Sequence, residues 1–156
     1  VNIGCAKMED VALPEMQTYK KYGGHDSVAH VVTLGKKHLV TFLDKIDDVD
    51  FEDFTQELSA CDGQLYADVD FVECVRVVNS VTVRMRVFGK VNGETWSCGT
   101  AAAAAAIAAI ERGDCSRGEL ITVKVKGGDL FVKINEDGSV EVDGPVKQAF
   151  KGIIEI

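Results

Sequence analysis

Positive charge is scarce in this sequence, and its scarcity excludes one large class of partner. There are 17 Lys and Arg against 25 Asp and Glu in 156 residues, which gives a formal net charge of −8. The basic residues are scattered along the chain. Nucleic-acid binding requires Lys and Arg gathered on one surface, where they neutralise phosphates. The composition therefore predicts a protein that binds no nucleic acid.

Metal-ligand patterns and membrane-length apolar runs are also missing. The five cysteines contain no Cys-x-x-Cys pair, and no His/Cys group has the spacing of a zinc site. The most apolar segment, Thr100–Arg112, would be about 20 Å long as a helix, which is too short to cross a bilayer. We therefore expect no metal site and no membrane span.

The cysteines and the start of the chain give expectations about its setting. No signal peptide is visible, so we expect a reduced, cytoplasmic protein in which most cysteines are buried as small apolar side chains. The chain begins with Val1 rather than Met, so we expect the natural N-terminus to lie elsewhere. A length of 156 residues suits one domain with its own core.

Alternating apolar and polar residues between Gly and Asp-Gly turns predict a mainly antiparallel β structure. Two strands are expected in His30–Asp44, a hairpin in Asp68–Glu94 and a three-stranded meander in Glu119–Gly144. A helix is expected within Asp44–Cys61, where Asp50 could cap its start and Phe51, Phe54 and Leu58 share one face. The residues expected on the inward side of the hairpin are Val75, Val77, Val81, Val83, Met85 and Val87.

An unusual run of alanines predicts a second helix. From Ala101 to Ile110 no side chain is polar, whereas a surface helix has a polar face. Six consecutive residues are alanine, the best helix former, and Gly113 is suited to end the helix. The pattern predicts a thin helix over Thr100–Arg112 that is buried on all sides. The simplest fold that buries it is an α+β domain whose mostly antiparallel sheet curls around this central helix.

Cys98 directly precedes this helix, and two interpretations of it are open. The unpaired N–H groups and the dipole at a helix N-terminus favour an anion, either a thiolate or a bound carboxylate. The N–H groups of Gly99 and Thr100 could hold a substrate carboxylate beside the Cys98 thiol. Alternatively, Cys98 is only a small residue at a tight helix start.

The segment around Cys98 resembles the second cysteine motif of the diaminopimelate epimerases, Gly-Glu-Thr-x-x-Cys-Gly-Thr/Ser followed by an alanine-rich helix. The matching residues are Gly93, Glu94, Thr95, Cys98, Gly99 and Thr100. Four further segments resemble the family in the same order: Val1–Gly4 with Pro14, Val32–Asp44, Ala67–Cys74 and Asp143–Ile156. The resemblance covers nearly the whole chain, and it implies the fold of that family's C-terminal domain.

The resemblance implies a cofactor-independent isomerase of lysine biosynthesis that inverts an amino-acid α-carbon with two cysteines. One thiolate removes the α-proton, and the other thiol delivers a proton to the opposite face. Cys98 matches one of these cysteines, with Glu94, Gly99 and Thr100 near the substrate. The family's other cysteine belongs to an N-terminal domain. The remaining cysteines of this chain lie in no matching motif: Cys5, Cys61, Cys74 and Cys115.

Residues 1–156 are therefore interpreted as a single domain, the C-terminal half of a two-domain epimerase. Alone, this half should be inactive, and its partner would be the N-terminal domain that carries the second cysteine. In the family the tail, about residues 146–156 here, returns to that first domain.

Several positions that contact the distal end of diaminopimelate in the family are changed. The Asn and Pro of the family's Gly-Asn-Pro-His segment are Lys36 and Lys37, whereas His38 is retained. The second Asn of Asn-Val-Asn-Phe is Asp70, and the family's Glu-Arg pair falls at Gly89-Lys90. Lys cannot replace the bidentate guanidinium of Arg. We retain as candidate substrate contacts Lys36, His38, Asp70 and Lys90.

Three alternatives to a diaminopimelate epimerase half stay open. The enzyme could be a racemase of the same family that acts on another amino acid. The domain could be a non-catalytic module that binds a small carboxylate. Finally, two copies of the chain could form a homodimer that brings two Cys98 thiols to one cleft.

Overall fold

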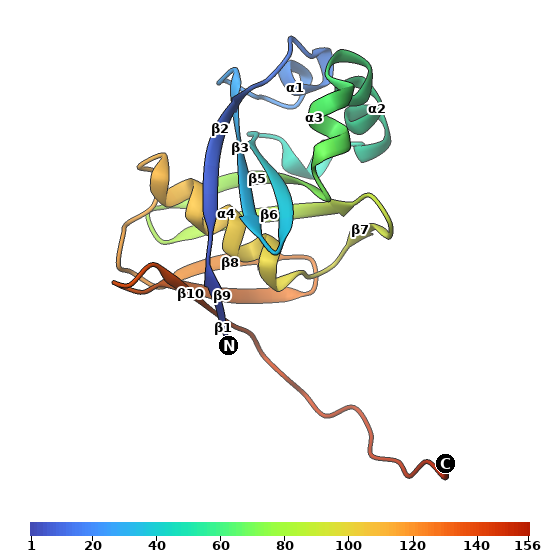
Figure 1. Ribbon diagram of the computed structural model, residues 1–156, viewed down its shortest axis with the longest axis vertical. Coiled ribbons are helices and arrows are strands. Elements are labelled where there is room, and N and C mark those ends of the chain that lie inside the picture. The colour runs from blue at the N-terminus through green and yellow to red at the C-terminus, as the bar shows by residue number, and fades with distance from the viewer.

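Ten strands form one strongly curved sheet that nearly closes into a barrel (Figure 1). The computed structural model describes residues 1–156. The strand order is β1-β10-β9-β8-β6-β5-β4-β3-β2, with β7 also paired to β6. Only Ala6 separates β1 from β2, so the continuous chain links the two ends of this order. The strands are β1 (Asn2–Cys5), β2 (Lys7–Ala12), β3 (Val28–Leu34), β4 (Lys36–Phe42), β5 (Phe71–Asn79), β6 (Thr82–Gly89), β7 (Gly93–Thr95), β8 (Ile121–Val125), β9 (Gly128–Ile134) and β10 (Ser139–Asp143).

The predicted antiparallel groups are confirmed. Strands β3 and β4 form a hairpin whose turn contains Gly35 with a φ of +72°, a conformation that glycine adopts without strain. Strands β5 and β6 form the second hairpin, and β8, β9 and β10 form the meander. Two parallel pairs, β4 with β5 and β6 with β8, were not predicted. The strands in each parallel pair are separated along the chain, so no local pattern reveals their register.

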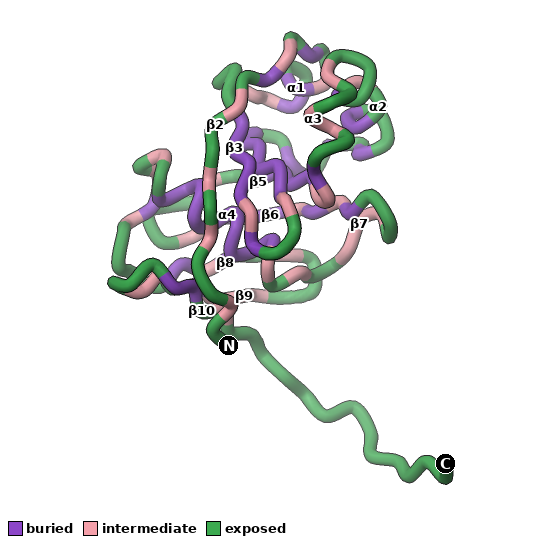
Figure 2. Tube along the Cα trace, in the orientation of Figure 1, coloured by how far each residue is buried: buried purple, intermediate pink, exposed green.

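The alanine-rich helix α4 (Gly99–Glu111) is enclosed by the sheet, as predicted (Figure 2). Every residue from Ala101 to Ile110 is buried. The helix ends before Gly113, whose φ is +84° and whose N–H bonds the carbonyl of Ile110 at 2.9 Å. Apolar side chains from seven strands surround the helix and include Val32, Val40, Phe42, Val75, Val83, Met85, Val87, Val123, Val132 and Val140.

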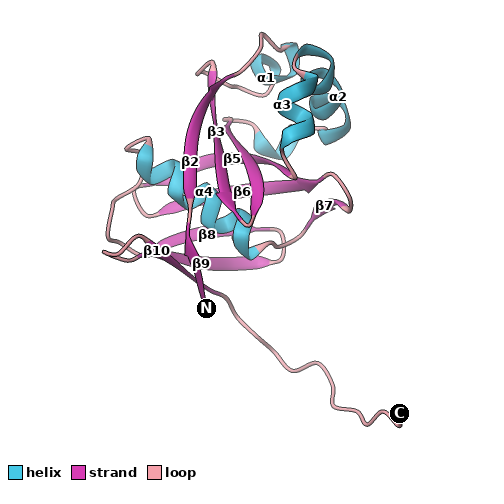
Figure 3. Cartoon of the chain, in the orientation of Figure 1, coloured by secondary structure: helices cyan, strands magenta, loops and turns pink.

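Three short helices cover the outer face of β3, β4 and β5 (Figure 3). They are α1 (Gln17–Lys21), α2 (Phe51–Cys61) and α3 (Gly63–Asp68), with a 3₁₀ turn at Ile46–Asp48. The prediction of α2 is confirmed, because the Asp50 carboxylate accepts hydrogen bonds from the N–H groups of Glu52 and Asp53. The α2 side chains Phe51, Phe54 and Leu58 pack in a second core with Leu39 and Val72. Helices α1 and α3 were not predicted.

Some burial predictions are wrong. Val81 is exposed because it lies in the turn between β5 and β6, although the alternation placed it inward. Cys5 and Cys61 are also exposed, whereas Cys74 and Cys115 are buried as expected. Cys5 ends the short strand β1, and Cys61 ends α2 on its solvent side.

Beyond β10 the chain leaves the barrel and extends away from it (Figure 1). Residues 144–156 form no helix or strand, and the side chains of Val146, Phe150, Ile153 and Ile154 are exposed. The tail adds no strand to its own sheet, so its return to another domain stays a prediction. None of the helices has the length and apolar character needed to cross a membrane.

Candidate active site

Cys98 lies in the short link between β7 and α4 and is the N-cap residue of the helix. Its backbone is extended, with φ −156° and ψ 116°, and its side chain is partly exposed. The Sγ atom lies 3.5 Å from Oγ1 of Thr100. Gly99 is exposed, and the nearest atom to a Cβ built there would be Cγ1 of Val142 at 3.8 Å. The thiol is therefore partly accessible to a small molecule, and the backbone at Gly99 is accessible beside it.

The N-terminus of α4 lacks the side-chain cap that the neighbouring helices have. Asp50 caps α2, and the Asp62 carboxylate accepts from the N–H of Leu65 to cap α3. No side chain accepts a hydrogen bond from the backbone N–H groups of the first turn of α4. The unpaired N–H groups of Gly99 and Thr100 can therefore bind an anion.

Glu94 is held by two cations. Arg86 donates to both carboxylate oxygens, with Nε–Oε1 and NH2–Oε2 distances of 2.7 and 3.0 Å, and Lys126 Nζ lies 3.0 Å from Oε1. The hydrogen bond from Arg86 lowers the pKa of Glu94 below its ordinary value, against a smaller effect of burial. The geometry shows a fixed carboxylate four residues before Cys98. Its contact with a substrate stays a prediction.

Other predicted site residues gather where β4, β5 and β6 meet one end of the sheet. The N–H of Lys37 donates to Oδ2 of Asp70 at 2.9 Å, and the carbonyl of Asp70 accepts from the N–H of Lys90 at 3.1 Å. Lys90 Nζ is engaged by two carbonyl oxygens at the end of α3, 2.7 and 3.2 Å away. Lys36 is exposed beside the Gly35 turn. Of the two lysines predicted at the site, Lys36 and Lys90, Lys36 therefore has the less constrained side chain.

His38 is fully buried against a carboxylate that the sequence analysis missed. Its Nδ1 lies 2.5 Å from Oε1 of Glu73, and its ring stacks on Phe71 with centroids 4.9 Å apart. Both members of the pair are wholly enclosed. Burial raises the pKa of Glu73 to about 7, and the hydrogen bond from His38 opposes this effect. The inward register of β5, which contains Val75, also contains Glu73, so the alternation could have placed it inside.

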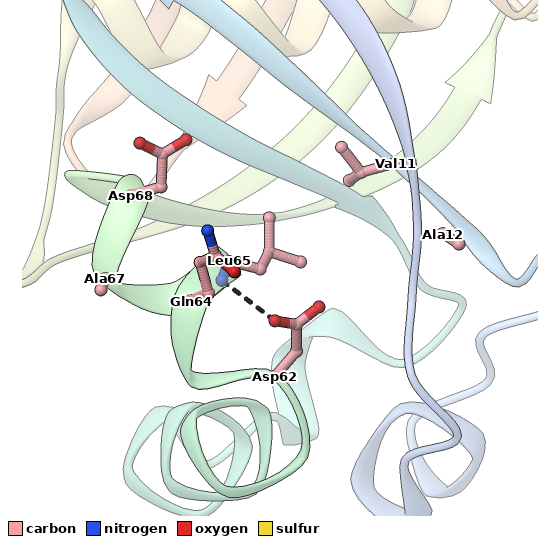
Figure 4. Close-up of a pocket in the computed structure, with 7 residues that line it drawn as sticks. All are labelled: Val11, Ala12, Asp62, Gln64, Leu65, Ala67 and Asp68. Carbon is pink, nitrogen blue, oxygen red and sulfur yellow. Dashed lines mark hydrogen bonds between the residues drawn. The ribbon is translucent and has the colours of Figure 1, made fainter.

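A hollow of about 550 Å³ beside α3 is a poor alternative site (Figure 4). Its lining includes the acids Asp62 and Asp68 but no cysteine and none of the predicted site residues. Asp62 is occupied in capping α3, and Asp68 is paired with Lys37 at 3.1 Å. No group of three His, Cys, Asp or Glu side chains in the structure is arranged to hold a metal ion.

Comparison with known proteins covers the segment that contains this candidate site. Residues 30–148, which include Cys98 and the whole of α4, match the family model described as diaminopimelate epimerase. The chain belongs to the diaminopimelate epimerase family. Proteins named diaminopimelate epimerase from Bacillus cereus and Bacillus anthracis are each 31% identical to it over 134 residues. These alignments cover 86% of this chain and 46% of each relative, so the chain spans about half the length of the curated relatives it matches.

Solved structures share the fold of this epimerase-family chain. A predicted epimerase from Pseudomonas aeruginosa superposes with a TM-score of 0.60 at 20% identity, covering 90% of this chain and 52% of that one. A putative phenazine biosynthesis protein from Clostridium difficile gives a TM-score of 0.57 at 13% identity, covering 98% and 59%. At these identities the comparisons establish the architecture alone.

The structure shows what surrounds one residue that departs from the resembled motif. By that resemblance Gly89 takes the position of the family's Glu, and a Cβ built there would lie 3.1 Å from Cε1 of Phe71. A longer side chain at residue 89 would therefore require the Phe71 ring to move. Phe71 is itself fixed by stacking on His38. The only wholly buried carboxylate in this part of the barrel is instead that of Glu73.

Proposed function

We propose that this chain forms one side of the active site of a cofactor-independent amino-acid epimerase, with Cys98 as one of its two acid–base thiols. The observation that carries the proposal is the position of Cys98, partly exposed at the uncapped N-terminus of α4. Membership in the diaminopimelate epimerase family supports the same chemistry.

In the proposed reaction, the substrate carboxylate accepts hydrogen bonds from the N–H groups of Gly99 and Thr100. One cysteine thiolate takes the α-proton, and the electron pair left behind is delocalised into the carboxylate. The helix N–H groups stabilise that negative charge as it develops. The second thiol, supplied from outside this chain, gives a proton to the opposite face of the carbon. One proton leaves and one returns, so the net change is inversion alone.

We propose diaminopimelate as the leading substrate, because the matched relatives carry that name. The exposed Lys36 is better placed than Lys90 to meet a distal carboxylate, since Lys90 Nζ is held by carbonyl oxygens of α3. A racemase of this family acting on a different amino acid is the alternative. The changed residues at this end of the sheet, Lys36 and Asp70 among them, favour that alternative.

A second domain is the proposed partner. None of the other four cysteines lies near the start of α4 in sequence, and the chain spans about half of its relatives. We propose that the chain alone is inactive and that the missing domain brings the second thiol. Pairing of two copies across their Cys98 residues is the alternative arrangement.

Exchange of the substrate α-hydrogen with solvent tests the proposal directly. In the complete protein incubated with diaminopimelate and other amino acids in D₂O, Cys98→Ala should slow exchange by roughly a hundredfold or more. Cys61→Ala is the matched control, because the Cys61 thiol is accessible to solvent but lies at the end of α2. This variant should exchange the α-hydrogen at the normal rate. Normal exchange in Cys98→Ala would refute the assignment. Carboxylate binding without any exchange in the unaltered protein would favour a non-catalytic binding module.

A further inference from the structure

His38 and Glu73 form an ionisable pair inside the barrel that the proposed chemistry does not yet use. Both are wholly buried, with Nδ1 of His38 2.5 Å from Oε1 of Glu73. In the sheet, Glu73 pairs in register with Val40 on one side and with Val87 on the other. Side chains in register share a face of the sheet. Because Val40 and Val87 pack around α4, Glu73 also faces the barrel interior.

The surroundings leave His38 with one polar partner. Every α4 residue from Ala101 to Ile110 is apolar, and the His38 ring stacks on Phe71. Five enclosed side-chain atoms of the chain find no hydrogen-bond partner, and three of them are Nε2 of His38, Oε2 of Glu73 and Oγ1 of Thr95. Thr95 lies in register with Val87, on the same face as Glu73, and precedes Cys98 by three residues. These three atoms lie on β4, β5 and β7, and β7 leads directly to the proposed catalytic thiol.

A buried pair of this kind is poorly explained by stability. Apolar side chains of similar size are often at least as stabilising as a buried ion pair, and an enclosed polar atom without a partner is unfavourable. A carboxylate next to an imidazole has a specific chemical effect, however. An ionised carboxylate only accepts hydrogen bonds, so it holds a proton on the nitrogen that faces it and leaves the other nitrogen without one.

We propose that Glu73 is a positioning residue for the epimerase reaction, which fixes His38 with its proton on Nδ1 and with Nε2 free to accept a hydrogen bond in the assembled active site. The proposal rests on the proposed function. Glu73 acts through His38 and touches no substrate, and no bond is made or broken in the pair. The free Nε2 is the atom through which the site would gain an acceptor once the second domain and the substrate are in place.

The test uses nitrogen-15 NMR of the histidine rings together with turnover in the complete protein. The chain has three histidines, so the His38 signals can be assigned with single substitutions. Measurements at about pH 8 keep the Glu73 carboxylate, whose pKa is about 7, mostly ionised. We expect His38 to be protonated on Nδ1 in the unaltered protein. In Glu73→Gln the amide can donate as well as accept, so the fixed tautomer should be lost and kcat should fall about tenfold or more with little change in KM.

Glu73→Asp separates positioning from packing. Gln matches the size of Glu, so a purely structural role predicts that the Gln variant is the better enzyme. Asp keeps the accepting carboxylate on a shorter stem, so the proposal predicts the opposite order and a retained Nδ1 proton. The comparison holds even if one variant is less stable than the other.

The second buried histidine supplies a matched control. Nδ1 of His30 lies 2.7 Å from Oδ1 of Asp10, and Nε2 of His30 also lacks a partner. This pair is on the side of the C-terminal end of α4, because His30 contacts Phe42 and the guanidinium of Arg112 lies 4.0 Å from the centre of the Phe42 ring. Asp10→Asn should alter the His30 signals while leaving His38 and kcat unchanged.

Two results would overturn the proposal. If His38 keeps its Nδ1 proton in Glu73→Gln, Glu73 does not set the tautomer. If the tautomer is lost but kcat is unchanged, the pair has no part in the reaction. Failure of the proposed function gives a different result, because the unaltered protein would then exchange no α-hydrogen whatever the His38 tautomer.

Discussion

Arg86 shows how a single side chain can join the layers of this fold. Its NH1 group donates to the carbonyl oxygens of Ile46 and Val49 at 2.6 and 2.9 Å, while its other nitrogens hold Glu94. Its guanidinium lies 4.9 Å from the centre of the Phe51 ring. Arg86 therefore ties strand β7, the start of α2 and the 3₁₀ turn to strand β6. Through β7 it also supports the link to Cys98.

Replacing Arg86 should be costly for stability. Arg86→Met keeps most of the stem but leaves two carbonyl oxygens without their donor and leaves Glu94 with Lys126 alone, so the free energy of unfolding should fall by about 2–4 kcal/mol. Arg84→Met is the control, because the Arg84–Asp47 pair two residues away is more exposed and should contribute less than about 1 kcal/mol. Urea unfolding monitored by circular dichroism measures both values. Equal losses in the two variants would contradict this account.

The Arg86–Glu94 pair predicts how the stability of the fold depends on pH. Arg86 lowers the folded-state pKa of Glu94, so the unfolded chain binds this proton more readily. The contribution of Glu94 is therefore complete above its unfolded pKa and is lost as pH falls through the lower folded value. Arg86→Met should flatten this part of the pH–stability curve.

Among the elements, α4 shows how the surrounding sheet restricts the size of the side chains in a helix. Ala101–Ala106 have no exposed surface, and strands on several sides pack against them. Each alanine allows a strand to approach the helix axis more closely than a larger side chain would. The barrel therefore accommodates a central helix only if the side chains of that helix are small.

Enlarging the helix should strain the barrel. Ala104→Leu adds three carbon atoms to a side chain that has no exposed surface, and this overpacking should destabilise the fold by about 1–3 kcal/mol. Ala60→Leu on the exposed side of α2 adds the same atoms with an expected effect within about 0.5 kcal/mol. Denaturation midpoints compare the two, and an unchanged midpoint for Ala104→Leu would show that the sheet can open around the helix.

The sequence predicted the elements whose patterns are local. The unbroken apolar run of Ala101–Ile110 required burial on all sides, and the glycine turns marked the hairpins. The short helices α1 and α3 were not predicted, because five or six residues are too few to show a helical repeat of apolar side chains. The pairings of β4 with β5 and of β6 with β8 depend on tertiary contacts between distant segments.

The candidate site was predicted unevenly for the same physical reason. The position of Cys98 at a helix start follows from neighbouring residues, whereas the partner of His38 comes from another strand. A polar residue in an alternating strand is ordinarily expected to face solvent, so Glu73 was missed. The contacts of two further site residues were also missed. Glu94 binds Arg86 and Lys90 binds the end of α3, and no local pattern places these partners beside them.

Viewed as a whole molecule, the chain is a nearly closed barrel with a tail that pairs with no strand. Val146, Phe150, Ile153 and Ile154 are exposed, although apolar side chains of this size are usually buried. Because residues 144–156 pair with no strand, they contribute little to the stability of the barrel. Their apolar surface suits a partner outside this chain.

Removing the tail should therefore have little effect on stability in one protein and a clear effect in another. In the 156-residue chain, ending it at Pro145 should change the free energy of unfolding by less than about 0.5 kcal/mol. In the proposed two-domain protein, the same deletion should lower stability and activity, because the tail would pack on the first domain. Thermal unfolding of both proteins and α-hydrogen exchange in the second make the comparison. A large loss of stability in the 156-residue chain would instead mean that the tail folds back onto its own barrel.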